Sequence, residues 1–247
     1  MEFFEMNSKL STEQLKAISR GQLLGRYGFA ISAELAAAGI MLAVHLICFL
    51  PVDQSTTAGL VLAFFISCIL DVLSGVFAAG LTRFYLNLVC NRPGSVKDIF
   101  YNFRVHTNKA LAIRLLTSIP QVIGCLPFLA SGILIADQEN PSAGLYLLYS
   151  AAMLVALIVY ISVWLLYSQA YYLLLDFPGY STRQIMSVSR RMMKGHKGRL
   201  FYLTVSLIPY YLLCFLSCGI ASLWVTPFSR VLFTNFYLDL IHRNHAA

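Results

Sequence analysis

The sequence contains little charge for its length. Asp, Glu, Lys and Arg make up only 12% of the 247 residues, about half of the share that is usual in soluble domains. At the same time, 58% of the residues are hydrophobic and the mean hydropathy is +0.71. Too few polar side chains are available to cover the surface of a soluble domain of this size, which excludes a soluble fold.

The common catalytic signatures are also missing. The sequence has no Walker loop, no HExxH, no GxSxG and no CxxC, so ATP hydrolysis, zinc proteolysis and serine hydrolysis have no motif to support them. The cysteines lie in or beside apolar stretches, where a cysteine is typically a small packing residue: Cys48, Cys68, Cys90, Cys125, Cys214 and Cys218. We therefore expect no catalytic residue, no metal site and no cofactor.

Long apolar runs predict an all-α, polytopic membrane bundle with about six transmembrane helices. A helix rises about 1.5 Å per residue, so about 20 apolar residues cross a hydrocarbon core of about 30 Å. The last two runs share one apolar stretch, which the small residues Ser217, Cys218 and Gly219 divide by a tight turn. Without that turn, the fifth helix would continue toward Pro227 and leave a re-entrant stub. The six runs are residues 27–50, 57–81, 111–136, 144–167, 200–216 and 219–240.

Basic residues occupy alternate connections between these runs. Residues 51–56 and 137–143 contain no Lys or Arg, whereas residues 91–110 and 177–199 contain many. By the positive-inside rule, both termini are expected on the cytoplasmic side of the membrane. The formal net charge of +7 then belongs to one membrane face, where it suits anionic lipid headgroups better than nucleic acid. We expect membrane lipids as partners and no nucleic acid.

Part of the sequence is repeated. Residues 11–20, STEQLKAISR, match residues 181–190, STRQIMSVSR, and a weaker third copy begins at Ser95. The first two copies begin with Ser-x-x-Gln, which is typical of a capping box at the start of a helix. Each copy precedes a pair of predicted spans. We expect one integral membrane domain, residues 1–247, built from three units that each combine an interfacial amphipathic helix with a helical hairpin: residues 9–90, 91–176 and 177–247.

Ionisable residues lie inside the predicted spans at Glu34, His45, Asp71, Arg114 and Arg230. A charge at that depth costs at least about 2.5 kcal/mol, so each should face protein or water and have a partner. Arg230 lies near the centre of the sixth span, and we expect Asp71, Glu34 or both to neutralise it. These three could form a structural ion network or a site that handles substrate or protons. His45 is expected to be a hydrogen-bonded packing residue, and Arg114 to extend toward the cytoplasmic interface.

A basic cluster follows the second copy of the repeat. Its residues alternate with apolar residues at helical spacing, which is typical of an interfacial helix that binds anionic lipid headgroups. Docking of an acidic membrane-protein partner is the alternative. The cluster comprises Arg190, Arg191, Lys194, His196 and Lys197.

Three segments carry a resemblance to a known family. Residues 167–174, residues 189–197 and the ending from Gly219 through Trp224 and Pro227 to Leu240 resemble the bacterial membrane family known as domain of unknown function 975. The resemblance extends over nearly the whole chain. It implies a multi-pass protein of the bacterial cytoplasmic membrane with an unassigned activity, and it supplies no catalytic residues.

Together, these features favour a non-enzymatic membrane protein, either a transporter-like or ligand-binding bundle or a scaffold. Internal repeats, intramembrane charges and the prolines Pro120 and Pro127 in one span occur in transporters and in scaffolds. The alternative is a lipid-modifying enzyme that uses Glu34, Asp71 or His45 as acid or base. A sealed interior would favour a scaffold, a water-accessible cavity that reaches Asp71 from one side would favour a transporter, and a cavity that opens laterally to lipid would favour an enzyme.

Overall fold

The computed structural model describes residues 10–53, 56–136, 138 and 140–244. Within these residues the chain is 82% helical and has no strand, which confirms the all-α prediction. The expected unit boundaries at residues 9 and 247 lie outside the described residues. The longer helices form three hairpins: α2 (Tyr27–Phe49) with α3 (Thr57–Val89), α5 (Thr107–Ala136) with α6 (Ala143–Tyr167), and α9 (Lys197–Val205) and α10 (Ile208–Leu216) with α11 (Ser222–Asn244).

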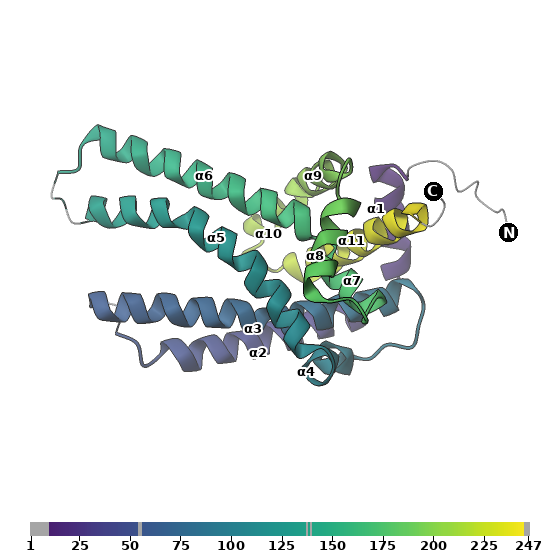
Figure 1. Cartoon of the computed structure of the whole chain (residues 1–247). Helices are drawn as coiled ribbons and strands as arrows, with labels where there is room; N and C mark the ends of the chain where they lie inside the picture. Colours follow the sequence, from purple (N-terminus) through teal and green to yellow (C-terminus); the bar gives the residue numbers. More distant parts are fainter. Residues whose placement is uncertain (1–9, 54–55, 137, 139, 245–247) are drawn as a thin grey trace.

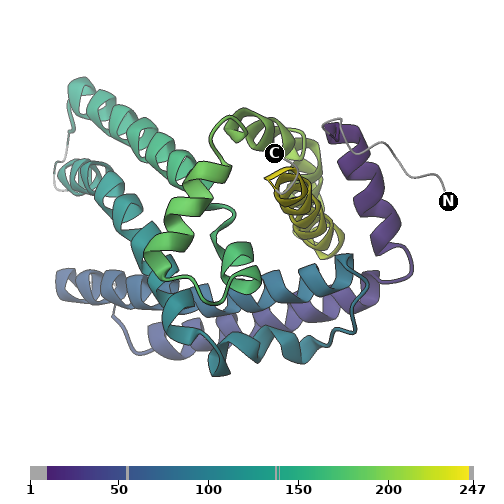
Figure 2. The same cartoon turned by 45° about the vertical axis from the view of Figure 1, so that its right-hand side comes forward.

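The short helices precede these hairpins, as the repeat predicts. They are α1 (Thr12–Leu23), the 3₁₀ helix η1 (Val96–Phe100) with α4 (Tyr101–Arg104), and α8 (Thr182–Met192). A further short helix, α7 (Ala170–Asp176), follows α6. In both Figure 1 and Figure 2, α1 and α8 run across the long hairpin helices rather than along them.

Capping boxes begin α1, η1 and α8. The backbone N–H of Ser11 donates to Gln14 Oε1 over 2.8 Å, and the backbone N–H of Gln14 donates back to Ser11 Oγ over 3.1 Å. Ser181 and Gln184 make the same pair of bonds, at 2.8 and 3.3 Å. The third copy uses Asp98 in place of Gln and opens a 3₁₀ turn rather than an α-helix. Capping at the three predicted serines is therefore confirmed.

The turn between α10 and α11 is where the small residues predict it. Cys218 and Gly219 have positive φ angles of 50° and 89°, and the N–H of Gly219 donates to the carbonyl of Cys214 over 2.8 Å. This left-handed geometry ends α10 and reverses the chain, because glycine adopts it without a steric cost. The hairpin is confirmed, and the continuous fifth helix toward Pro227 is excluded.

Among the described residues, five segments are long and apolar enough to span a membrane, one fewer than the expected six. The remaining helix, α11, is covered by protein. It packs against α1, α2 and α3, and its residues Val231, Leu232 and Phe236 are fully buried. The run at 219–240 falls short of the other five because it contains polar residues, among them Arg230, Asn235 and Asp239, and much of its helix is packed within the bundle. The five segments are Tyr27–Phe49, Ala58–Val89, Thr107–Ile135, Ala143–Asp176 and Lys197–Leu216.

Large apolar side chains on these five segments point outward, including Ile47, Leu147 and Phe215, which are 73%, 71% and 84% exposed. Such surfaces are compatible with contact to lipid. The α2–α3 and α5–α6 hairpins extend toward the same end of the molecule, and α1, α8 and most of α11 lie toward the opposite end (Figure 1).

Two glycines allow close packing on α3. A Cβ atom on Gly75 would lie 2.6 Å from Cβ of Arg114 and 2.9 Å from the hydroxyl oxygen of Tyr171, and one on Gly80 would collide with the carbonyl of Ile99. These positions therefore require glycine. Gly75 brings α5 and α7 onto α3, next to the point where the three hairpins meet.

Candidate functional site

A cavity of about 510 Å³ lies where the three hairpins meet. Helices α3, α5, α6, α7, α9, α10 and α11 all contribute to its wall. Much of the wall is aromatic or apolar, from Val163, Trp164, Tyr172, Leu200 and Phe233. Polar side chains interrupt this wall at a few points: Thr82, Arg114, Thr117, Gln121, Gln169, Thr226, Ser229 and Arg230.

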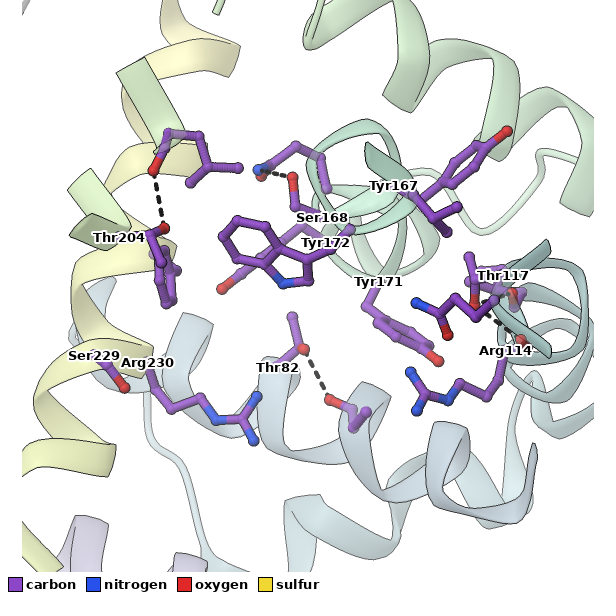
Figure 3. Close-up of a pocket in the computed structure, with 18 of the residues that line it drawn as sticks. Thr82, Arg114, Thr117, Tyr167, Ser168, Tyr171, Tyr172, Thr204, Ser229 and Arg230 are labelled. Atoms are coloured by element: carbon purple, nitrogen blue, oxygen red, sulfur yellow. Dashed lines mark hydrogen bonds between the residues drawn. The ribbon is translucent and has the colours of Figure 1, made fainter. Parts of the chain in front are cut away.

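Two arginines extend into this cavity from opposite sides. Arg114 comes from α5 and Arg230 from α11, and Figure 3 shows their guanidinium groups pointing toward one another, with Thr82 of α3 between them. Their side chains are 32% and 42% exposed. Two like charges that face one low-dielectric space repel each other, so each needs a compensating partner.

Asp71 of α3 compensates Arg114. Nε of Arg114 donates to Asp71 Oδ2 over 3.1 Å, and Nη2 donates to Asp71 Oδ1. Ser118, one turn further along α5, donates its hydroxyl to the same carboxylate. Of the two partners expected for Arg230, Asp71 is therefore not the one used, because it pairs with Arg114 instead. The absence of a side chain at Gly75 brings α5, rather than α11, against this part of α3.

Glu34 of α2 compensates Arg230. Nε of Arg230 lies 3.4 Å from Glu34 Oε1, and the Glu34 side chain is only 17% exposed. Tyr85 of α3 is fully buried next to this pair. The prediction that Arg230 lies inside the bundle and pairs with Glu34 is therefore confirmed.

Two polar atoms at the cavity wall have no partner among the described residues. Gln169 is 2% exposed, and its Nε2 donates to Ser168 Oγ over 2.9 Å, but its Oε1 accepts nothing. The hydroxyl of Tyr171 is also buried without a partner. An unsatisfied buried polar group costs about 1–3 kcal/mol. Both residues line the cavity, but these two atoms are packed inside its wall and are not exposed to it.

Sequence reasoning missed Gln169 and Tyr171 as site residues. The signal was present, because residues 167–174 carry the family resemblance. The structure explains this segment: α6 ends at Tyr167 and α7 begins at Ala170, so the helix is interrupted at the cavity wall.

Tyr172 and Tyr237 hold α11 against α7, the short helix that follows this interruption. Tyr237 donates its hydroxyl to Asp176 Oδ2 over 2.5 Å, and the rings of Tyr172 and Tyr237 stack at 4.6 Å. The hydroxyl groups of Tyr172 and Thr234 lie 3.1 Å apart. The polar residues of α11 therefore face protein.

The other predicted site residues lie outside the cavity. His45 is exposed on α2, where its Nδ1 is 2.9 Å from the carbonyl of Met41 and its ring stacks on Phe49. The basic cluster lies at the end of α8 and the start of α9, and none of its residues lines the cavity. His196 is half-buried, and the other four cluster residues are exposed: Arg190, Arg191, Lys194 and Lys197.

Comparison with known families assigns the chain. The model of the family described as Protein of unknown function (DUF975) matches residues 6–244, and the chain belongs to this family. The resemblance inferred from the sequence is therefore confirmed. No curated protein and no solved structure matches the chain. The five long apolar helices are compatible with a membrane protein, and the cavity is the feature from which a function can be argued.

Proposed function

We propose that this protein binds an amphipathic anion in the central cavity of a non-enzymatic, multi-pass membrane bundle. The observation that carries the proposal is the convergence of Arg114 and Arg230 on one cavity. A guanidinium has five N–H donors. Arg114 uses Nε and Nη2 on Asp71, and Arg230 approaches Glu34 with Nε alone. The remaining N–H groups can bind a carboxylate or phosphate, the anions that the planar guanidinium recognises through paired N–H···O bonds.

The rest of the wall suits the apolar body of such a ligand. Trp164 and Phe233 form an edge-to-face pair at 5.9 Å on one side of the cavity. Gln169 and Tyr171 contribute further polar side chains to this wall. A volume of about 510 Å³ falls within the range of about 300–1,000 Å³ for small-molecule sites.

The position of the cavity favours a transporter-like or ligand-binding bundle over a scaffold. Transporters typically bind substrate where structural repeats meet, next to interrupted helices. Here the cavity lies between three hairpins, and the break at Ser168 and Gln169 forms part of its wall. Pro120 and Pro127 lie inside α5, which also supplies Arg114.

A lipid-modifying enzyme is the alternative, and the ion pairs argue against it. Asp71 and Glu34 are each paired with an arginine, and neither carboxylate is among the residues that line the cavity. His45 bonds its own helix outside the cavity. The arrangement therefore supports binding without chemistry.

We further propose that the bundle lies in the cytoplasmic membrane with both termini in the cytoplasm, so that α11, packed against α1, α2 and α3, returns through the interior of the bundle as a sixth crossing. The Lys and Arg asymmetry of the connections supports this orientation. The basic cluster would then contact anionic headgroups on the cytoplasmic face, while Ile185 and Met192 of α8 stay buried against the bundle.

A tryptophan assay tests the binding proposal. The chain has two tryptophans, and a Trp224→Phe variant leaves Trp164 in the cavity wall as the sole reporter. Titration with dodecyl phosphate in a neutral detergent should change the Trp164 emission saturably, whereas dodecyltrimethylammonium should not. The double variant R114Q/D71N removes both members of the ion pair, so that no carboxylate is left without its partner. It should weaken binding about 10- to 100-fold, as expected for a charge-assisted hydrogen bond of about 1.5–3 kcal/mol.

The control is Arg183→Gln, which removes an exposed positive charge from α8. It should leave the dissociation constant unchanged. Equal affinity in all variants would contradict the proposal. Mass spectrometry of the recovered ligand separates the two functions, because release of dodecanol would indicate an enzyme and unchanged dodecyl phosphate a binding protein.

A further inference from the structure

A second cavity lies on the other side of α11 from the first. It has a volume of about 370 Å³ and lies between α1, α2, α10 and α11. Its wall includes Arg20, Tyr27, Tyr210, Leu213, Trp224 and Phe228, none of which lines the central cavity. We call it the outer groove.

One end of the outer groove is basic. Nη2 of Arg20 donates to the hydroxyl of Tyr210 over 2.7 Å, and its guanidinium carbon lies 5.9 Å from the ring centre of Phe228. Lys16, one turn earlier on α1, lies 5.8 Å from the ring centre of Tyr210 and donates to the carbonyl of Ser206. None of the salt bridges among the described residues involves either cation. Among the residues that the structure describes, these two positive charges therefore have no acidic partner.

The rest of the outer groove is apolar. Leu213 and Trp224 are 54% and 50% exposed, and they face the groove together with Val225. Arg20 precedes Tyr27, the first residue of the α2 span, whereas Leu213 lies within the span Lys197–Leu216. The basic end therefore lies where a span begins, and the apolar end continues along the span. A lipid headgroup and its acyl chain have the same order of polarity.

We propose that the outer groove binds one anionic phospholipid. Its phosphate lies between Arg20 and Lys16, where arginine offers a planar pair of donors and lysine a point charge. Its acyl chain packs on Leu213 and the indole of Trp224. A soluble anion would leave the apolar end uncovered, and a neutral lipid would leave both cations without a counter-ion. This inference does not depend on the ligand of the central cavity, because the two sites share no residue and have different tryptophans.

A quenching experiment in vesicles tests it. A Trp164→Phe variant leaves Trp224 as the sole tryptophan, and it is reconstituted in phosphatidylcholine that contains a minor fraction of one brominated lipid. Brominated phosphatidylglycerol should quench Trp224 more strongly than brominated phosphatidylcholine. Removal of a basic residue near a headgroup lowers the preference about fivefold, so R20Q/K16Q should make the two lipids nearly equal. Arg183→Gln, which removes one exposed positive charge away from the outer groove, should retain the full preference.

Further variants keep the test decisive if the double variant does not fold. Arg20→Lys keeps the charge and should retain most of the preference, while Lys16→Gln alone should lose part of it. Equal quenching by both lipids in the unsubstituted chain would overturn the proposal. A preference that survives in R20Q/K16Q, or that inorganic phosphate abolishes, would also overturn it, because these results indicate a general headgroup effect or a simple anion site.

Discussion

Arg114 of α5 binds Asp71 of α3 through two nitrogen atoms, and Ser118 donates to the same carboxylate from the next turn of α5. This contact joins the first hairpin to the second at the wall of the central cavity. It also leaves Nη1 of Arg114 without a partner among the described residues. The same residue therefore holds two hairpins together and presents a charge to the cavity.

Loss of Arg114 should destabilise the protein through the carboxylate that it leaves behind. Removal of one member of a buried pair costs about 3–5 kcal/mol, and the exposure of roughly a third here reduces the expected cost to about 1–3 kcal/mol. The melting temperature of Arg114→Gln in mild detergent should fall accordingly. The double variant R114Q/D71N should be more stable than the sum of the two single losses predicts, by at least about 0.5 kcal/mol.

The control double variant combines a substitution at Asp71 with one at Arg230, the arginine that Asp71 does not contact. Arg230→Gln combined with Asp71→Asn should give additive losses, whereas Arg230→Gln combined with Glu34→Gln should not, because only Glu34 lies 3.4 Å from Arg230. Coupling between Arg230 and Asp71 of the same size as that between Arg114 and Asp71 would refute the observed pairing.

Gly75→Ala should destabilise the contact among α3, α5 and α7. The new methyl group would meet Cβ of Arg114 at 2.6 Å and the Tyr171 hydroxyl at 2.9 Å, and overpacking of this kind costs about 1–3 kcal/mol. Gly39→Ala is the control, because nothing lies within 4 Å of its added Cβ and the position is in the interior of α2. Its thermal stability should stay unchanged or rise, since alanine favours the helix. Equal effects of the two substitutions would contradict the close packing.

Ser181→Ala should loosen the first turn of α8. The change removes the hydroxyl that accepts from the N–H of Gln184, which costs about 1 kcal/mol of local helix stability. Hydrogen exchange at the first amides of α8 should then accelerate about fivefold. Ser187→Ala, inside the same helix, is the control and should not accelerate exchange. Unchanged protection in Ser181→Ala would mean that packing alone holds this turn.

Cysteine labelling tests the proposed orientation. In a chain without the native cysteines, Asp53→Cys and Asn140→Cys should react with an impermeant thiol reagent in intact cells, whereas Arg183→Cys should react only after the membrane is opened. Asp53 and Asn140 lie in connections without basic residues, and Arg183 lies on the basic side. The opposite labelling pattern would reverse the topology.

The sequence by itself determined the features that depend on near neighbours in the chain. Ser181 and Gln184 form a capping box because residues three positions apart meet in the first turn of any helix. Gly219 ends α10 because its backbone tolerates positive φ whatever surrounds it. The partner of Arg230 could be narrowed in advance to Asp71 or Glu34, because position along a span sets depth in the membrane and an arginine side chain bridges a difference of about one helical turn.

Only the tertiary structure decided which helices are neighbours at the depth of these charged residues. Asp71 lies at a height that either arginine could reach, and Gly75 assigns it to Arg114 by bringing α5 closer than α11. Likewise, α11 mixes apolar residues with polar ones such as Arg230 and Asn235, and only its packing against α1, α2 and α3 shows what those side chains contact. Gln169 and Tyr171 became site residues only when three hairpins enclosed a cavity, since such a space depends on side chains from distant parts of the chain.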